Sequence, residues 1–215
     1  MMEQPTSQPI TRDFLSRPGI EVAPDLLGGV LCHRTAEGVV AVRLTEVEAY
    51  MGADDPGSHA YRGQTPRNAV MFGPAGFLYV YFTYGMHFCA NVVCGEDGTA
   101  TAVLLRAGEV VEGQDVAQSR RPAVRTPRDL ARGPARLTTT LGIAREHNGA
   151  DLIGEASELS LERSDELPER VATGPRVGVA SPGGDGVHFP WRFWIESDPT
   201  VSTYRAHSPR RRRKA

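Results

Sequence analysis

The sequence predicts a single α+β domain with an antiparallel-rich curved sheet, surrounding helices and a protruding β-hairpin. Strand-like segments follow one another with short turns between them, as neighbouring strands of antiparallel sheets do. Several helical patterns accompany these strands, which favours α+β over a doubly wound fold. The length of 215 residues suits one domain, and an apolar fraction of 40% permits a sizeable core.

The two ends of the chain differ in composition from its middle. The start is polar and contains proline, so we expect residues 1–12 to be disordered. The folded domain is expected over residues 13–204. Residues 205–215 form a basic tail that ends in four arginines and Lys214, followed by one alanine.

The first part of the domain begins with a short helix and continues with strands. Residues 20–28 predict a helix that ends at Gly28, because glycine commonly follows the last helical turn. Residues 30–33 and 39–50 have the composition of strands, and a turn separates them. Residues 51–68 are polar and rich in turn residues, so we expect a loop there.

A hairpin is the clearest element of the sequence. Residues 77–84 and 86–94 are apolar and aromatic, and Gly85 lies between them where a tight turn needs it. Residues 102–106 predict a further strand. The remaining predicted elements are a helix over 111–121, an irregular stretch over 122–133, a helix over 134–141 that begins with proline and ends at Gly142, and strands over 176–179 and 191–195.

The charge of the chain is nearly balanced but unevenly placed. A formal net charge of −2 excludes a protein that is basic throughout, so affinity for phosphate must come from local patches. Two patches exist: six arginines between residues 120 and 136, and the basic tail. Lys214 is the only lysine, so we expect no lysine Schiff-base nucleophile in the folded part.

Cysteine usage and hydropathy indicate a cytoplasmic protein. Cys32, Cys89 and Cys94 show no C-x-x-C spacing, and we expect free, mostly buried thiols. No apolar run approaches the roughly 18 residues of a membrane-spanning helix. The start of the chain also lacks the basic and apolar regions of a secretory signal.

Two carboxylates and an aromatic ring alternate at residues 46, 48 and 50. Residues of the same parity share one face of a strand, so Glu46, Glu48 and Tyr50 are predicted to point the same way. Two solvated surface carboxylates would explain the pair. The alternative is a pocket in which one carboxylate, its pKa raised by burial, acts as general base on a water molecule. The pattern does not distinguish Glu46 from Glu48 in that role.

The same parity argument applies to the aromatic strand of the hairpin. It places Tyr79 and Tyr81 on one face, and Phe82 and Tyr84 on the other. Core packing is expected for Tyr79 and Phe82. Tyr84 adjoins the glycine of the turn, where a bulky ring has little core to enter, so it either packs against the turn or serves as an exposed anchor or wedge.

Four further polar residues are candidates for a site. Asn91 interrupts an apolar strand, so it belongs either to a buried hydrogen-bond network or to a surface that reads a ligand. Arg106 ends another apolar strand, where either an ion pair or a phosphate contact would suit it. His59 and His87 lack the spacing of a metal site, and a loop histidine more often forms hydrogen bonds.

Three motifs together resemble the alkyladenine (3-methyladenine) DNA glycosylase family. They are Glu-x-Glu-Ala-Tyr at 46–50, Thr-Pro-Arg-Asn at 65–68 and Tyr-Val-Tyr-x-x-Tyr-Gly-Met at 79–86. The resemblance extends over most of the chain and would make residues 13–204 the glycosylase domain. It implies a mixed α/β fold whose hairpin enters the minor groove of DNA, and a monofunctional enzyme that hydrolyses the N-glycosidic bond of a damaged purine.

Carried over by position, the resemblance implies a role for each candidate residue. Glu48 is implied as the general base that activates water. Tyr50 and Tyr81 are implied to sandwich the extruded base. The other implied roles are His59 at the pocket edge, Tyr84 as the wedge in the vacated stack, Asn91 as the residue that rejects guanine through its exocyclic amine, and Arg106 as a backbone phosphate contact.

The implied partner is double-stranded DNA that contains a damaged purine of the 3-methyladenine, 7-methylguanine, hypoxanthine or ethenoadenine class. We expect a monomer without a cofactor, a metal or a membrane. Two other classes stay open: a DNA-binding module that lost catalysis, against which the presence of Glu48 argues, and a metal-dependent hydrolase using His59 and His87. The basic tail is either a solubilising end or a non-specific DNA contact.

Overall fold

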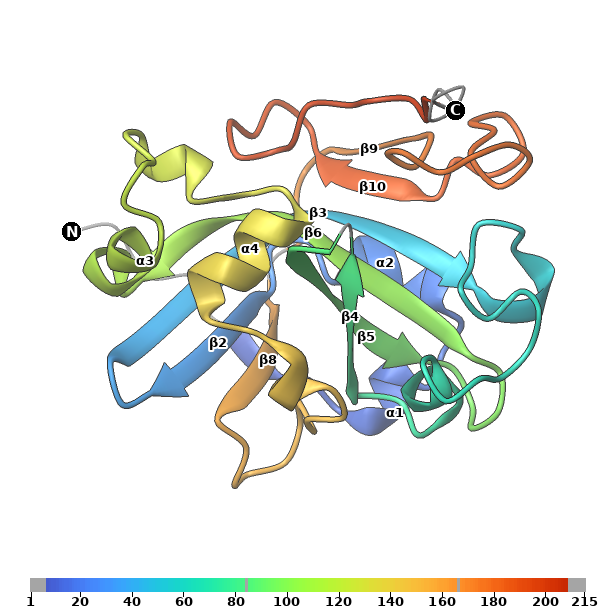
Figure 1. The fold of residues 1–215 in the computed structure, drawn as a ribbon, viewed down its shortest axis with the longest axis horizontal. Coiled ribbons are helices and arrows are strands. Elements are labelled where there is room, and N and C mark those ends of the chain that lie inside the picture. The colour runs from blue at the N-terminus through green and yellow to red at the C-terminus, as the bar shows by residue number, and fades with distance from the viewer. Residues whose placement is uncertain (1–6, 84, 166, 209–215) are drawn as a thin grey trace, which may run out of the picture.

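The long strand β3 (Gly38–Met51) lies at the centre of the fold in the computed structural model, which describes residues 7–83, 85–165 and 167–208 (Figure 1). Along one edge it pairs first with β2 (Val30–Thr35) and then with β10 (Arg192–Ile195). Its other edge pairs with β6 (Thr101–Glu112). The segment that carries Glu46 and Glu48 therefore has a strand on each side.

The sheet around β3 is antiparallel in all the pairs formed by the described residues, which confirms the predicted α+β class. Its main path runs β1-β8-β2-β3-β6-β5-β4. Beside this path, β10 pairs with β3 and β9, and β7 pairs with β6. The remaining strands are β1 (Ser7–Pro9), β4 (Leu78–Thr83), β5 (His87–Cys94), β7 (Ala131–Arg132), β8 (Leu159–Ser164) and β9 (Val171–Gly174).

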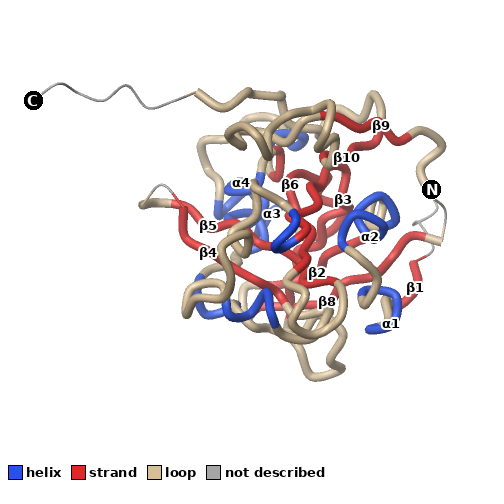
Figure 2. The backbone as a smooth tube through the Cα atoms, turned by 90° about the vertical axis from the view of Figure 1, so that its right-hand side faces the viewer, coloured by secondary structure: helices blue, strands red, loops and turns tan. Residues whose placement is uncertain are grey.

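Short helices cover both faces of this sheet. Figures 1 and 2 agree that α2 (Gly19–Asp25) and α4 (Pro134–Leu141) lie on opposite sides of β3 and β6. Helix α4 has the predicted bounds, because proline suits its first turn and Gly142 adopts the left-handed conformation that ends it, with φ +72°. The other helices are α1 (Arg12–Leu15) and α3 (Gln114–Arg120), with 3-10 turns η1 (Gly52–Asp54), η2 (Ala69–Phe72), η3 (Pro127–Asp129) and η4 (Arg145–His147).

The apolar residues form a main core and a smaller cluster. In the main core, each fully buried leucine, such as Leu44 or Leu105, contributes roughly 1.5–3 kcal/mol by leaving water. The smaller cluster includes Met71 and Tyr79, and Tyr81 packs against it. This cluster therefore anchors the strand that carries Tyr79 and Tyr81.

The predicted hairpin is present as β4 and β5, and Figure 2 shows it extending outward from the body of the sheet. Gly85 has φ +71°, and the Met86 N–H donates to the Thr83 carbonyl at 3.2 Å, which closes the turn. Tyr84 lies outside the described residues. The expected core packing of Phe82 is wrong: the ring is 40% exposed and meets Phe88 at 5.1 Å between ring centroids.

Two predictions are wrong: the disorder of the first residues and the strand at 176–179. Residues 7–12, expected to be disordered, pack on the domain: β1 pairs with β8, and Ile10 is buried. The pairing partner lies about 150 residues away in sequence, so local composition could not reveal it. Residues 176–179, predicted as a strand, form none. The Arg176 side chain forms a buried ion pair with Asp55, and Gly178 adopts φ +70°.

The state of the cysteines is as the sequence predicts. Cys32, Cys89 and Cys94 are free and buried, as predicted. Among the described residues, no helix has the length and apolar character needed to cross a membrane.

Candidate active site

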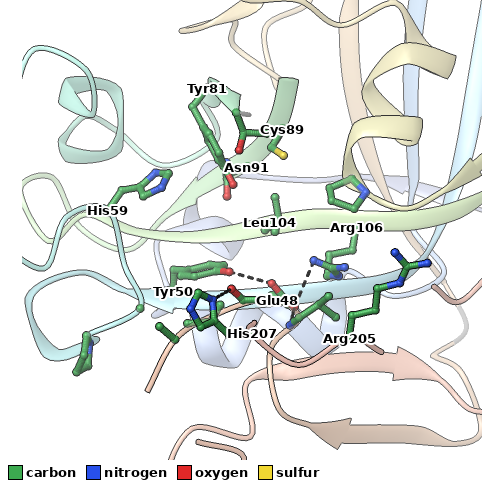
Figure 3. Close-up of a pocket in the computed structure, with 18 of the residues that line it drawn as sticks. Glu48, Tyr50, His59, Tyr81, Cys89, Asn91, Leu104, Arg106, Arg205 and His207 are labelled. Carbon is green, nitrogen blue, oxygen red and sulfur yellow. Dashed lines mark hydrogen bonds and ion pairs between the residues drawn. The ribbon is translucent and has the colours of Figure 1, made fainter. Parts of the chain in front are cut away.

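Glu48 lies on the floor of a cavity of about 870 Å³ (Figure 3). Its side chain has no exposed area, and both oxygens have donors. Oε2 accepts a hydrogen bond from the Tyr50 hydroxyl at 2.9 Å, and Oε1 accepts one from the Val177 N–H at 2.7 Å. The Arg106 Nη1 lies 3.4 Å from Oε1. The carboxylate is thus held in one orientation, mainly by neutral donors.

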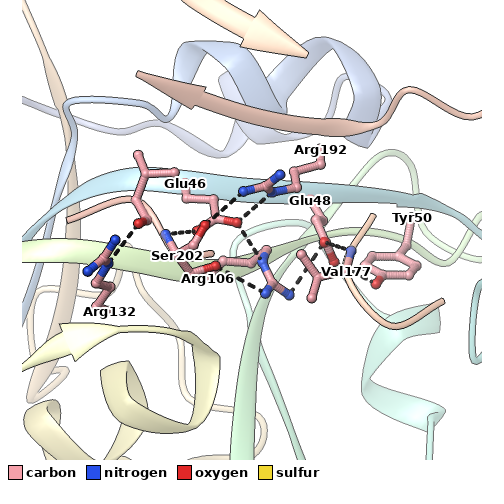
Figure 4. A network of polar contacts seen from close by, with 9 residues as sticks. Glu46, Glu48, Tyr50, Arg106, Arg132, Val177, Arg192 and Ser202 are labelled. Carbon is pink, nitrogen blue, oxygen red and sulfur yellow. Dashed lines mark hydrogen bonds and ion pairs between the residues drawn. The ribbon is translucent and has the colours of Figure 1, made fainter. Parts of the chain in front are cut away.

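Glu46 is equally buried but has different surroundings (Figure 4). Its Oε1 accepts from Arg106 Nε at 3.0 Å and from Arg192 Nε at 2.6 Å, and its Oε2 accepts from the Ser202 N–H at 2.7 Å. Burial alone would raise the pKa of Glu46, but the two guanidiniums outweigh it and hold the pKa below its ordinary value. Glu46 does not line the cavity, so the structure separates two carboxylates that the pattern could not rank.

The parity prediction for this strand is confirmed. Arg106 contacts both carboxylates, and Glu48 bonds to Tyr50, so all three side chains lie on one face of β3. The pairing of β3 with β6 shifts register on both sides of Glu46. Such bulges re-aim side chains near functional sites, and here the shift lies directly beside the two acids.

Three aromatic rings shape the walls of the cavity. Figure 3 shows Tyr50 and Tyr81 on opposite sides of it, with His59 at one edge. Tyr81 stacks on Tyr79 at 5.6 Å between centroids and meets the edge of His59 at 4.5 Å. Burial raises the pKa of Tyr50 and of Tyr81 well above the ordinary value, and Glu48 adds to the effect at both. Both phenols therefore stay neutral.

His59 and Asn91 complete the polar lining. His59 Nδ1 lies 3.2 Å from the Tyr79 hydroxyl, and burial together with Arg67 lowers the pKa of this imidazole, which favours its neutral form. Asn91 is buried on β5, and its Nδ2 donates to the Tyr79 carbonyl at 3.1 Å. That bond fixes the plane of the amide at the cavity wall.

Arg106 is almost completely buried, unlike a surface arginine that contacts phosphate. It is 5% exposed, and its guanidinium contacts Glu46, Glu48 and the Ser202 hydroxyl. Of the two readings that the sequence left open, the ion pair accounts for these contacts; the phosphate contact stays a prediction. Tyr84 and its wedge role lie outside the described residues.

The sequence did not indicate the segment at Arg176 and Val177, which contacts both Tyr50 and Glu48. The fully buried Arg176 bonds Asp55 through both Nη atoms at 2.5 and 2.6 Å, and its guanidinium carbon lies 4.5 Å from the centre of the Tyr50 ring. The guanidinium thus packs on the Tyr50 ring, and the N–H of the next residue, Val177, donates to Glu48. A backbone donor has no residue type, and only the turn residues Pro175 and Gly178 could have indicated a loop here.

The end of the described chain also contributes to the site. Arg205, His207 and Ser208 line the cavity, and the Gly178 N–H donates to the Arg205 carbonyl at 2.9 Å. Upstream, Val201 accepts a bond from Arg132. The first residues of the predicted basic tail are therefore part of the cavity wall.

The metal alternative for His59 and His87 finds no geometric support. In the part of the chain that the structure describes, the one group of three His, Cys, Asp or Glu side chains placed to share an ion contains neither residue. His59 instead bonds to Tyr79, and His87 begins β5 on an exposed position.

Comparison with known proteins identifies close relatives over almost the whole chain. The sequence model of the family described as methylpurine-DNA glycosylase (MPG) matches residues 13–199. A Streptomyces avermitilis protein named "Putative 3-methyladenine DNA glycosylase" is 56% identical over 215 residues, covering 99% of this chain and 100% of the relative. Proteins of the same name from Leifsonia xyli subsp. xyli and Nocardia farcinica are 54% and 56% identical, covering 91% and 86% of this chain and 92% and 86% of their own.

Proposed function

Because the chain belongs to the methylpurine-DNA glycosylase family and is a DNA glycosylase, we propose that it excises alkylated or deaminated purines with a water molecule activated by Glu48. The proposed substrates are 3-methyladenine, 7-methylguanine, hypoxanthine and ethenoadenine in double-stranded DNA. The product is an abasic site. The observation that carries this proposal is the fixed Glu48 carboxylate at the floor of an aromatic cavity.

The proposal requires the damaged nucleotide to leave the duplex. The glycosidic bond of a stacked base is out of reach of a buried carboxylate, so the base must rotate into the cavity at a cost of a few kcal/mol. Tyr84 is proposed to fill the vacated space in the stack, from a hairpin whose neighbouring residues Phe82 and Met86 are exposed. Apolar side chains on both sides of the turn suit entry between base pairs.

The chemistry of the cavity suits a flat, positively charged ring. A methylated purine between Tyr50 and Tyr81 would gain roughly 0.5–2 kcal/mol from the attraction of a cation to aromatic faces. His59 supports this because its lowered pKa keeps it neutral, so it does not repel the cation. Asn91 is proposed to disfavour guanine, since a 2-amino group placed against the fixed amide would clash or lose its partner. 7-Methylguanine carries the same amino group, and its excision is proposed to rely on the positive charge that already weakens its glycosidic bond.

Glu48 is proposed to act on both the water and the sugar. The carboxylate accepts a proton from the attacking water, and its charge steadies the positive sugar that forms as the glycosidic bond breaks. Arg106 is proposed to hold Glu48 in place and to contact a nearby phosphate. Because Glu48 has no exposed area, the water reaches it when the wall made by Val177 and the 205–208 segment adjusts to bound DNA.

Leaving-group chemistry separates two kinds of lesion. A ring-methylated purine already carries the positive charge that weakens its glycosidic bond, so it needs no proton. A neutral base such as hypoxanthine leaves more easily when protonated. The raised pKa values of Tyr50 and Tyr81 make both phenols poor acids, so we propose that neutral lesions are excised more slowly.

The test uses duplexes that each contain one 7-methylguanine or one hypoxanthine. After incubation with the full chain, released base is quantified by chromatography and abasic sites by alkaline cleavage. We expect equal amounts of both products, and strand breaks only after alkali. An undamaged duplex is the control. Well-folded protein that releases no base, or that cuts the strand without alkali, would contradict the proposal.

A further inference from the structure

A second cluster of side chains lies where β2, the turn η4 and the start of β8 meet. It consists of His33, His147 and Glu158, and one ligand atom from each lies within 4.8 Å of the others. None of the three lines the cavity beside Glu48. The cluster is therefore a separate place in the fold from the cavity beside Glu48.

His33 carries the strongest observation in this cluster. Its side chain is 2% exposed, and Nδ1 lies 2.7 Å from the Leu141 carbonyl at the end of α4. A carbonyl only accepts, so the proton sits on Nδ1 and the lone pair on Nε2. Among the described residues, this Nε2 is one of two buried side-chain atoms without a hydrogen-bond partner. A buried, unpaired acceptor is costly unless something binds it.

The unpaired nitrogen points toward the other two side chains. Glu158 Oε2 lies 3.9 Å from His33 Nε2, and this carboxylate is 75% exposed on its other sides. The backbone below it is fixed, because the Glu158 carbonyl accepts a bond from the Arg34 N–H at 2.9 Å. The rings of His33 and His147 meet edge to face at 4.8 Å. One buried and two accessible donors thus converge on one point.

We propose that His33, His147 and Glu158 bind a divalent transition-metal ion of the zinc class. Two imidazoles and one carboxylate form a donor set that suits zinc, nickel or cobalt rather than magnesium or calcium. A ligating histidine usually donates its other N–H to a carbonyl or carboxylate, and the Leu141 carbonyl occupies that position for His33. The fourth ligand is water, because Glu158 opens to solvent.

Metal binding requires two local adjustments. Ligand atoms about 2.0–2.2 Å from zinc are roughly 3.3 Å apart in a tetrahedron, so the exposed Glu158 side chain must move inward. His147 Nδ1 accepts a bond from the Ala144 N–H at 3.0 Å, and a neutral imidazole has only one lone pair. The ion therefore replaces that bond. The nearby Arg120 is held by Glu37 at 2.9 Å, which offsets its repulsion of a cation.

The site would join segments that are far apart in the sequence. His33 belongs to β2, His147 follows α4, and Glu158 precedes β8. A bound ion would act as a clamp that stabilises the folded state in proportion to its free concentration. At zinc 100-fold above its Kd, we expect the melting temperature of this chain to rise by about 5–10 °C.

The experiment titrates ZnCl2 into chelator-treated full-length protein against a chromophoric chelator, and repeats the titration with CoCl2, whose absorption reports ligand geometry. Glu158→Gln and His147→Gln are the test variants; both keep size, and glutamine can still accept the Ala144 N–H. His188→Gln is the matched control, since His188 is a 74% exposed histidine paired with Asp185 at 2.7 Å.

We expect one ion per wild-type or His188→Gln chain, at least tenfold weaker binding in the two test variants, and a zinc-dependent shift of the Ala144 amide resonance. Base excision by Glu158→Gln should equal that of wild type. The proposal is overturned if wild type binds no zinc, if all four proteins bind equally, or if His59→Gln rather than Glu158→Gln abolishes binding.

Discussion

Glu46 and Glu48 lie two residues apart on one face of β3, and neither is exposed, yet their surroundings prepare them for different tasks. Glu46 is surrounded by two guanidiniums and a backbone N–H, which use its lone pairs. Glu48 has a phenol, a backbone N–H and one longer guanidinium contact, and it faces a cavity. Burial therefore does not separate the two carboxylates. Their partners and the cavity beside Glu48 do, and these are the basis for proposing Glu48 as the general base.

The largest effect is expected from Glu48→Gln. The amide that replaces the carboxylate cannot take a proton from water, so the single-turnover rate of 7-methylguanine excision should fall by about 10²–10⁴. The loss of unfolding free energy in denaturant should be much smaller than that of Glu46→Gln, because the glutamine oxygen still accepts the bond from the Val177 N–H and its NH2 group can donate to the Tyr50 hydroxyl. If Glu48→Gln excises 7-methylguanine at the wild-type rate, Glu48 is not the general base and the proposed difference between Glu46 and Glu48 is wrong.

Glu46→Gln should affect stability before chemistry. The change leaves the buried Arg192 without its countercharge and Arg106 with only its longer contact to Glu48, which costs roughly 3–5 kcal/mol of unfolding free energy. Urea denaturation measures this loss. Glu109→Gln is the matched control, since it removes an exposed partner of Arg43 across the same strand pair and should cost less than about 1 kcal/mol. Equal losses in both variants would contradict the role of the Glu46 network.

The pH dependence of stability should test the ion pairs of Glu46 a second time. The folded-state pKa of Glu46 is lowered, so its ion pairs add stability that is complete above the unfolded-state pKa near about 4.3. That contribution is lost as the pH falls through the lower folded-state pKa. We expect the gap in unfolding free energy between wild type and Glu46→Gln to be constant from pH 7 to 5 and to shrink below about pH 4.3. A difference in unfolding free energy that grows below about pH 4.3 would contradict the lowered pKa of Glu46.

The smallest effect is expected from Tyr50→Phe. The ring still lines the cavity, but the hydroxyl that orients Glu48 Oε2 is lost. One hydrogen bond to a charged group contributes about 1.5–3 kcal/mol, so excision should slow by roughly 10- to 100-fold with little change in DNA affinity. Rates and binding to a single-lesion duplex measure the two effects separately. Weakened binding without a slower rate would assign Tyr50 to base stacking alone.

The elements that the sequence predicts well are those with local causes. The hairpin turn at Gly85 and helix 134–141 each need only neighbouring residues, since glycine permits a positive φ and proline suits a first helical turn. The shared face of Glu46, Glu48 and Tyr50 follows from the two-residue period of a strand, and the motifs around them indicated the family.

The partners of those side chains have no such local cause. Arg192 and Ser202 reach Glu46 from about 150 residues away in sequence, and the Val177 N–H comes from a turn where the pattern predicted a strand. The sequence by itself therefore determines that Glu46 and Glu48 share one face of β3. Their different hydrogen-bond partners are decided only by the tertiary structure, when distant segments pack around them. Hydrogen bonds and ion pairs act over a few ångströms in space, and chain folding alone establishes those distances.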